Sequence, residues 1–225
     1  SNALRNALRR IGQEQGLSFY DARAQQGFLR NVVVRVTTLG EVMMVMAFGG
    51  PDMEAIRAYL DAVLAEFPQL TSVYYCVNTK VNDFLGDLEM IHYHGQEWVE
   101  EKLRDVRFRI GPRSFFQTNT KQAERLYSIV EEFAELSGQE NVYDLYTGLG
   151  SIALFLAHRC RQVVGIEEVA SAIEDARDNA RLNEIDNAVF YAGDVKDILS
   201  PEFAATHGPP DLVITDPPRA GMHPK

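Results

Sequence analysis

The residues best suited to chemistry are a glycine turn and an acid that follows it further along the chain. The apolar run Val142–Tyr146 predicts a buried strand, and Gly148 and Gly150 form a tight turn directly after it. A second predicted strand, Val163–Ile166, ends at Glu167. Glycines let a backbone approach a ligand closely, and a carboxylate about twenty residues further on accepts hydrogen bonds from ribose hydroxyls. The pattern therefore indicates a nucleoside-binding site, and both NAD and S-adenosylmethionine fit it.

Two more acidic residues follow apolar runs nearer the end of the chain. A carboxylate at Asp194 could accept the adenine amino group or cap the helix after it, and we favour the ligand role because the strand ends of such a sheet meet at one crevice. Asp216 begins the stretch Asp-Pro-Pro-Arg, in which two prolines fix the backbone. This rigid acidic loop is typical of enzymes that methylate nucleobases, where a flipped base is held beside the methyl donor. A structural turn is the alternative.

The segment before the glycine turn predicts a helix that positions it. Residues 118–119 offer a cap, and the helix runs to about Leu136. Phe115 and Phe116 are expected in the core, and the amide of Gln117 is the polar side chain there that could face a base or a cofactor. The expected buried face of the helix comprises Ala123, Leu126, Ile129, Val130 and Phe133.

The apolar patterns divide the chain into two domains, residues 1–112 and residues 113–225, with a Gly-Pro hinge between them. The first begins with a predicted helix over residues 4–15 and is a small α+β domain. The second alternates strands with helices such as 151–159, which predicts an α/β fold. In the first domain, periodicity predicts two strands, a helix and three further strands in the order Phe28–Thr37, Glu41–Phe48, Pro51–Phe67, Ser72–Asn78, Glu89–His94 and Val106–Ile110.

Composition limits the function classes. Of the 225 residues 46% are hydrophobic, so a packed core is available, and no apolar run approaches membrane-spanning length. Cys76 and Cys160 are the only cysteines in the sequence, which excludes a disulfide framework or a cysteine-based metal cluster within this chain and favours a reducing cytoplasm. The histidines show no convincing metal-ligand spacing, and we expect no metal.

The negative net charge of the chain is compatible with RNA binding only at a local basic patch. A formal net charge of −10 speaks against a protein that coats phosphates in general. We take Arg30 and Arg35 as candidate RNA contacts, with ordinary solvated arginines as the alternative. They belong to a run of arginines toward the N-terminal end, namely Arg5, Arg9, Arg10, Arg23, Arg30 and Arg35.

Five motifs together carry a resemblance to a known family. FFQTN, DLYTGLGS, VVGIE, AGD and DPPRAG resemble the RNA 5-methyluridine methyltransferases, which act on uridines of ribosomal or transfer RNA. The stretches LRNVVVRV and GPRSFFQTNTKQAE are similar to the central domain of that family and to its junction. From about Leu17 onward, the resemblance implies a Rossmann-like class I methyltransferase half-sheet preceded by a small α+β central domain for RNA. It also implies S-adenosylmethionine as the cofactor.

The resemblance implies a set of site residues as well. Ser151 occupies a further family position, at which several relatives carry asparagine. The glycines of the turn are expected to line the methionine end of the cofactor. The positions that correspond to cofactor and substrate contacts of the family are Gln117, Tyr146, Glu167, Asp194 and Asp216.

One departure from the family concerns the nucleophile. C5 of uracil is a poor nucleophile, so a thiolate must add at C6 before methyl transfer, and a base must then remove the C5 proton. The family carries this cysteine in a Ser-Cys-Asn-Pro-like stretch after the acidic loop, and its base glutamate further on. We expect both beyond Lys225, which leaves this chain without catalytic residues and inactive. Cys76 and Cys160 are expected to be buried small hydrophobic residues.

We therefore expect S-adenosylmethionine-dependent methylation of uridine C5 in RNA, with ribosomal RNA favoured over transfer RNA. One alternative is a base-amino or protein-amide methyltransferase, in which the acidic loop polarises the amine without a cysteine. Another is a non-catalytic RNA-binding module. The expected strand order is third, second, first, fourth, which leaves Leu212–Thr215 at an open edge. This edge predicts either self-association or a cover by the C-terminal residues.

Overall fold

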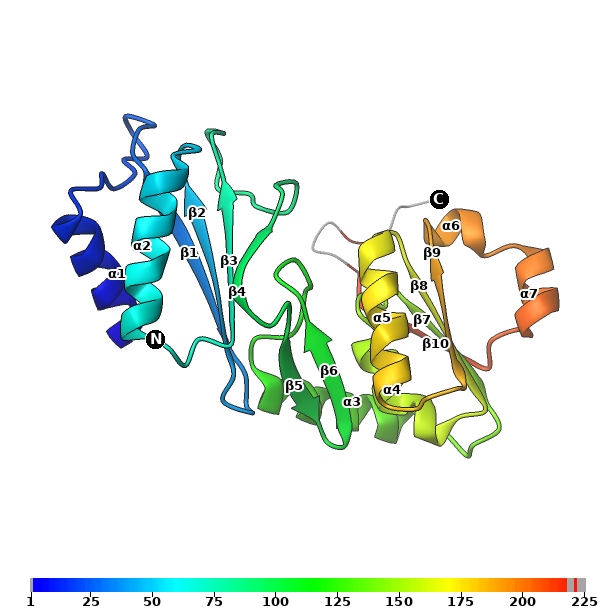
Figure 1. Ribbon diagram of the computed structural model, residues 1–225. Coiled ribbons are helices and arrows are strands. Elements are labelled where there is room, and N and C mark those ends of the chain that lie inside the picture. The colour runs from blue at the N-terminus through cyan, green and yellow to red at the C-terminus, as the bar shows by residue number, and fades with distance from the viewer. Residues whose placement is uncertain (1, 218–220, 222–225) are drawn as a thin grey trace. The chain divides into compact units, whose positions relative to one another are not determined.

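The computed structural model describes residues 2–217 and 221 and divides the chain into two units (Figure 1). Unit 1 comprises Ser1–Val99 and Gly111–Arg113, and unit 2 comprises Glu100–Ile110 and Ser114–Lys225. This division differs from the expected one at residue 112, because the hairpin of residues 100–110 belongs to unit 2. The backbone N–H groups of Arg107 and Arg109 donate to side-chain oxygens of asparagines in unit 2, at 2.8 Å each.

Unit 1 is a four-stranded sheet with two helices on one face (Figure 1). Its strand order is β1-β2-β3-β4, with β2 and β3 parallel and the two outer pairs antiparallel. The elements of this unit are α1 (Asn2–Glu14), β1 (Leu29–Val36), β2 (Val42–Phe48), α2 (Met53–Glu66), β3 (Ser72–Val77) and β4 (Ile91–Gly95).

Helical periodicity explains how the two helices of unit 1 pack. Buried residues of α1 recur at helical spacing as Leu4, Leu8 and Ile11, and they join the core formed by α2 and the sheet. Asp52 caps α2 by accepting a hydrogen bond from the Ala55 N–H at 3.0 Å. The hydroxyl of Tyr59 in α2 donates to the carbonyl of Leu8 at 2.9 Å, which ties the two helices together.

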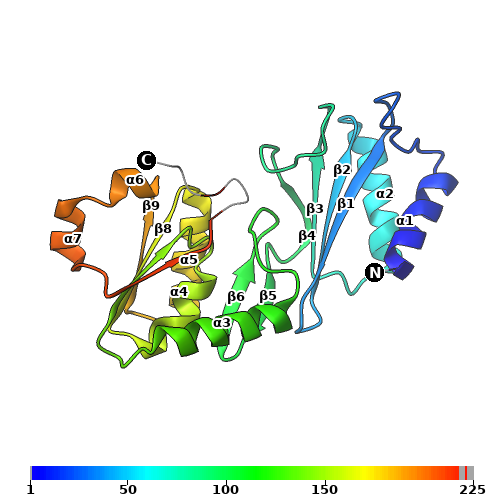
Figure 2. The same cartoon turned by 180° about the vertical axis from the view of Figure 1, so that it is seen from behind.

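Unit 2 contains a parallel sheet in the order β10-β7-β8-β9 (Figure 2). Numbered along the chain, this is fourth, first, second, third, so the expected strand order and the α/β fold class are confirmed. β10 lies at one edge of this sheet and β9 at the other. The strands are β7 (Asn141–Leu145), β8 (Gln162–Glu167), β9 (Ala188–Ala192) and β10 (Leu212–Thr215).

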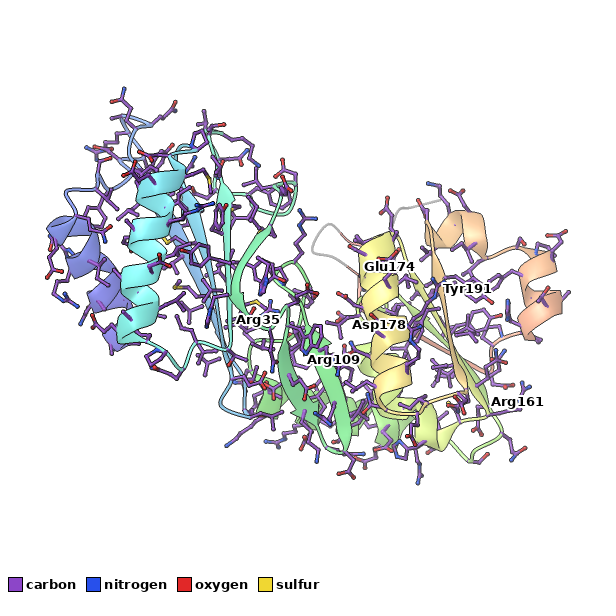
Figure 3. All side chains as sticks on the ribbon, viewed as in Figure 1. Arg35, Arg109, Arg161, Glu174, Asp178 and Tyr191 are labelled. Atoms are coloured by element: carbon purple, nitrogen blue, oxygen red, sulfur yellow. The ribbon has the colours of Figure 1, made fainter. Side chains whose placement is uncertain are left out.

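The helices of unit 2 connect these strands. Tyr191 of β9 points toward α7, where its ring lies 5.1 Å from that of Phe203 and 4.9 Å from that of His207 (Figure 3). The strand β5 (Val99–Leu103), which pairs with β6 (Val106–Ile110), was not expected from its charge-rich sequence. The helical elements are α3 (Thr120–Ala134), α4 (Ser151–Leu156), a 3-10 turn (Ala157–Arg159), α5 (Ala170–Leu182), α6 (Val195–Ile198) and α7 (Pro201–His207).

The buried face of α3 differs from the expected one. Ala123 is buried as predicted, but Leu126 and Phe133 are 52% and 82% exposed, and Ile129 is 40% exposed. The helix instead buries Ala123 and Tyr127. The sequence of α3 carries apolar residues on two faces, and packing within the unit selects the face that includes the tyrosine.

The two phenylalanines before α3 differ in their burial. Phe116 is buried and packs on Phe108 of β6 with ring centroids 5.5 Å apart, whereas Phe115 is 73% exposed. The expectation of two core aromatics is therefore wrong for Phe115. Adjacent residues in an extended segment point in opposite directions, so only one of the pair can enter the core.

Candidate functional site

The parallel sheet of unit 2 brings the predicted residues to one end. The carboxyl ends of neighbouring parallel strands lie at the same edge of a sheet. Tyr146 follows β7, Glu167 ends β8, Asp194 follows β9 and Asp216 follows β10. Four strands far apart in sequence thus deliver one aromatic residue and three acids to the same end of the sheet.

The glycine turn after β7 depends on left-handed backbone. Tyr146, Gly148 and Gly150 have φ angles of 66°, 57° and 84°. Such angles are easily reached by glycine but disfavoured for tyrosine. The N–H groups of Tyr146 and Thr147 both donate to the Ile166 carbonyl, at 2.8 and 3.1 Å, which holds the turn on β8.

Glu167 is joined directly to this turn. Its Oε2 accepts the Gly148 N–H at 3.2 Å, and its Oε1 accepts the Val169 N–H at 3.0 Å. The structure therefore brings together the glycine and the acid that the sequence paired by spacing. A carboxylate oxygen has two lone pairs, so each oxygen of Glu167 retains the capacity to accept another hydrogen bond.

Asp144 is an acid of the site that the sequence reasoning missed. It lies in the middle of β7 with only 1% exposure. Its Oδ2 accepts hydrogen bonds from the Thr147 hydroxyl at 2.6 Å and the Ala153 N–H at 3.1 Å. Its Oδ1 is buried without a hydrogen-bond partner among the described residues. An acid in an otherwise apolar strand, three residues before the glycine turn, was the available signal.

Burial controls the ionisation of this acid. Removal from water raises the pKa of Asp144 to about 7, against the two hydrogen bonds that favour its charged form. The negative charges of Asp216 and Glu167 raise this pKa further. Asp216 and Glu167 therefore both lie close enough to Asp144 for their charges to act on it.

A tyrosine from α3 completes this cluster. The Tyr127 hydroxyl lies 3.1 Å from the Ser151 Oγ, at the first residue of α4. Burial raises the pKa of Tyr127, and the charges of Asp216 and Asp144 act in the same direction. α3, the glycine turn and the start of the acidic loop therefore converge. The Pro218 and Arg219 positions of that loop lie outside the described residues.

Asp194 caps the short helix after β9. Its Oδ1 accepts the Lys196 N–H at 3.0 Å, and its Oδ2 pairs with the Lys196 ammonium at 2.5 Å. Asp194 thus forms the helix cap that was one of its two expected roles, and its role as a ligand of the adenine amino group stays a prediction. Gln117 is half-buried, and no hydrogen bond of its side chain occurs within the described part of the chain.

The arginines of unit 1 occupy unexpected positions. The Arg30 side chain is 1% exposed. Its guanidinium donates to the carbonyls of Asn78 and Lys80, at 2.6 and 2.5 Å, and pairs with Asp83. Arg30, which lies in β1, therefore holds the loop after β3 rather than facing solvent as an RNA contact. Arg35 is half-buried and donates to the Gly111 carbonyl at 3.1 Å, and burial lowers its pKa.

Both cysteines are buried, as expected. Burial raises the pKa of Cys160 to about 11 and also raises that of Cys76. Each thiol is therefore held in its neutral, poorly nucleophilic form near pH 7. Among residues 2–217 and 221, no three His, Cys, Asp or Glu side chains come together as a metal site, and no helix is long and apolar enough to cross a membrane.

Comparison with known proteins gives relatives along nearly the whole chain. Residues 136–218 match the family described as a methyltransferase domain. An uncharacterized RNA methyltransferase of Porphyromonas gingivalis is 54% identical over 205 residues, which are 91% of this chain and 44% of that protein. One from Bacteroides thetaiotaomicron is 48% identical over 99% of this chain and 50% of its own length. The chain thus spans about half the length of these curated relatives.

A solved structure resembles the chain over both units. It is the tRNA (uracil-54, C5)-methyltransferase of Pyrococcus abyssi in complex with S-adenosyl-L-homocysteine. The similarity has a TM-score of 0.76 with 33% sequence identity, and it covers 97% of this chain and 51% of that one. The chain therefore has the Rossmann-like fold of class I methyltransferases.

Proposed function

We propose that the chain forms part of an S-adenosylmethionine-dependent RNA methyltransferase that acts on C5 of a uridine. The observation that carries the proposal is the joining of Gly148 and Glu167 at the carboxyl end of the parallel sheet. This geometry suits a nucleoside ligand. Relatives known as RNA methyltransferases and a solved uracil-C5 enzyme support the remaining part of the proposal.

The groups at this end of the sheet fit S-adenosylmethionine. Each Glu167 oxygen has already accepted one backbone N–H and can accept a ribose hydroxyl as well. A side chain added at Gly148 would meet nothing within 4 Å, so the turn leaves space for a ligand beside its backbone. When bound, the cofactor supplies an electrophilic methyl group.

The other contacts follow from the same arrangement. Asp194, which follows β9 at the carboxyl end of the sheet, would accept the adenine amino group. Gly150 and Ser151 would line the methionine end, because they lie where the turn enters α4. The remaining two cofactor residues of the proposal are Tyr146 and Gln117.

Methylation of uracil at C5 requires a group that holds the base and a thiolate that adds to C6, and Asp216 is suited to the first of these roles. Its carboxylate would hold the edge of the flipped base beside the methyl donor. A thiolate must add to C6, and neither Cys76 nor Cys160 is suited to this step, since both are buried and neutral. We therefore propose that the attacking cysteine and the base lie outside residues 1–225, and that this chain alone transfers no methyl group.

The two parts of the chain then have different roles. Unit 1 would contact the RNA, and unit 2 would hold the cofactor. Ribosomal RNA is the proposed target, although the solved relative is a tRNA enzyme, so both RNAs belong in the test. A cytoplasmic location is part of the proposal, and the two free, buried cysteines are consistent with it.

Product analysis tests this proposal. The full-length protein is incubated with unmodified ribosomal RNA or tRNA and labelled S-adenosylmethionine, and the RNA is digested to nucleosides for mass spectrometry. The expected product is 5-methyluridine from ribosomal RNA, with no incorporation by residues 1–225 alone. A methylated amino group would support the base-amino or protein-amide alternative. Uridine methylation by residues 1–225 alone would refute the claim that the attacking cysteine lies outside them.

A further inference from the structure

We propose that unit 1 carries a contact for single-stranded RNA, in which the ring of Phe19 stacks on a base while Arg5 and Arg9 bind flanking phosphates. This inference rests on the proposed function, because it concerns how an RNA substrate is held. It places the contact on α1 and on the segment before β1, in a groove that Arg30 also lines although its own side chain is buried.

A shallow groove lined by residues of α1, β1 and the segment before β1 provides the place. Its volume is about 240 Å³, and its floor is apolar because Leu8, Leu29 and Tyr59 are buried beneath it. Phe19 and Val32 at its border are 46% and 36% exposed. The groove thus offers open apolar surface on the scale of one planar ring.

The ring of Phe19 is held in place by a glycine of α1. A Cβ at Gly12 would lie 3.2 Å from the Phe19 Cζ and 2.5 Å from the Leu29 Cδ1. Glycine is unfavourable inside a helix, so its presence here indicates that close packing is required. Phe19 also forms an isolated bridge with Leu29, and the neighbouring Tyr20 N–H donates to the Leu29 carbonyl at 2.9 Å. The ring therefore presents its exposed side without having to be ordered by the ligand.

Two arginines beside this ring are available for an anion. Arg5 and Arg9 both line the groove and lie about one helical turn apart on α1. Neither forms an ion pair within the described part of the chain, whereas Arg10 pairs with Glu14 and Glu66. No carboxylate is present among the described residues that line the groove. The charge there is positive, in a chain whose net charge is −10.

The combination of groups favours nucleic acid over an acidic peptide. Every base has a flat π-face that stacks on an aromatic ring, and single-strand binders pair such rings with cations for the phosphates. An acidic peptide would use the arginines but would gain nothing specific from Phe19. A duplex would hide its bases from the ring. The partner that uses all three side chains is a single strand.

The test measures fluorescence anisotropy of a labelled, unstructured RNA of about twelve nucleotides, within the site sizes of single-strand binders. Phe19→Leu keeps an apolar side chain against Gly12 but removes the π-face, and we expect about tenfold weaker binding. Arg5→Ala and Arg9→Ala should each weaken binding several-fold and lower the log–log salt slope by about 0.7. Arg10→Ala is the matched control and should change the affinity less than about twofold, because its charge is already paired.

Several outcomes would overturn the proposal. Unchanged RNA affinity in the Phe19→Leu, Arg5→Ala and Arg9→Ala variants would show that RNA does not bind at this groove. If Arg10→Ala weakened binding as much as Arg5→Ala and Arg9→Ala, the affinity would come from the overall positive charge of α1 instead. Preference for a polyglutamate peptide or for duplex RNA would identify a different partner. Circular dichroism checks that each variant folds. The nucleoside product of the full-length protein tests the proposed function separately, so its failure is distinguishable from loss of this contact.

Discussion

The two ends of the parallel sheet in unit 2 differ in the charge and the pairing of their polar groups. At the amino end, the Asn141 side-chain amide donates to the carbonyls of His207, Gly208 and Pro209 at 2.9 to 3.0 Å. The Tyr143 hydroxyl donates to the Gly208 carbonyl at 2.7 Å. The Asp211 carboxylate also accepts the Asn141 backbone N–H there, at 2.8 Å, so the chain joins itself at this end through groups that are paired with one another.

The carboxyl end gathers negative charge instead. The charges of Asp216 and Glu167 raise the pKa of the buried Asp144 there, and one oxygen of Asp144 has no partner among the described residues. The adjoining Tyr146 has a positive φ of 66°. A folded chain gains nothing from such an arrangement by itself. The comparison teaches that the amino end serves stability and the carboxyl end serves a ligand, and the predictions below separate these two tasks.

The largest expected effect concerns the buried acid. The pKa of Asp144 is higher in the folded than in the unfolded chain, so its stabilising contribution is complete below about pH 4 and is lost as the pH rises through about 7. A shift from 3.8 to about 7 corresponds to about 4 kcal/mol at most. Asp144→Asn, which resembles the protonated acid, should remove this decline. Urea unfolding of both proteins between pH 5 and 8 measures it, and parallel pH profiles would contradict the buried-charge account.

A smaller loss is expected at the amino end. Asn141→Ala removes the amide that holds three carbonyls and should lower the free energy of unfolding by about 2 kcal/mol. The affinity for S-adenosylmethionine should stay the same at a temperature where the variant is folded. Chemical unfolding and calorimetry give the two values. A variant that is fully stable but binds the cofactor poorly would reverse the assignment of the two ends.

The sheet edge gives a prediction about association. β10 lies at the edge of the sheet, and its Val213 is 48% exposed. Such an edge favours pairing with another strand, so we expect residues 1–225 to self-associate as concentration rises. Val213→Lys should prevent this, whereas Leu39→Lys, at a similarly exposed apolar residue of unit 1, should not. Light scattering decides, and a wild-type chain that stays monomeric at every concentration would refute the edge argument.

The smallest expected effect is a difference in cofactor affinity between variants of two tyrosines. Tyr127→Phe and Tyr143→Phe each remove one hydroxyl, at opposite ends of the sheet, and should each lower stability by about 1 kcal/mol. Only Tyr127→Phe should weaken cofactor binding, and by less than tenfold, because it frees the Ser151 hydroxyl. Equal affinities of the two variants for S-adenosylmethionine would show that the Tyr127 contact is purely structural.

The sequence was sufficient for those features that follow from local rules. Alternating apolar runs and turns gave the α/β class, and the resemblance to methyltransferases gave the strand order. The spacing from Gly148 to Glu167 assigned both residues to one ligand site, and the structure joins them by a hydrogen bond. These predictions required no knowledge of packing between distant side chains.

The remaining features depend on tertiary packing. α3 has two apolar faces, and only its neighbours decide that Tyr127 is buried while Phe133 is exposed. Arg30 was expected at the surface, but its guanidinium is buried against carbonyls of the loop after β3. Asp144 could be noticed in the sequence as an acid within a predicted buried strand, but its relation to Glu167 and Asp216 follows only from the fold.

The central claim is that Glu167 and the glycine turn form the ribose end of a cofactor site. Two hydrogen bonds from hydroxyls to one carboxylate contribute about 1.5–3 kcal/mol each. Calorimetry of S-adenosylmethionine with residues 1–225 tests this directly, with Glu168→Ala as a matched control, since Glu168 is an exposed acid adjacent in sequence. We predict that Glu167→Ala binds at least tenfold more weakly than the wild type and that Glu168→Ala binds equally well. Unchanged affinity in a folded Glu167→Ala variant would contradict the account.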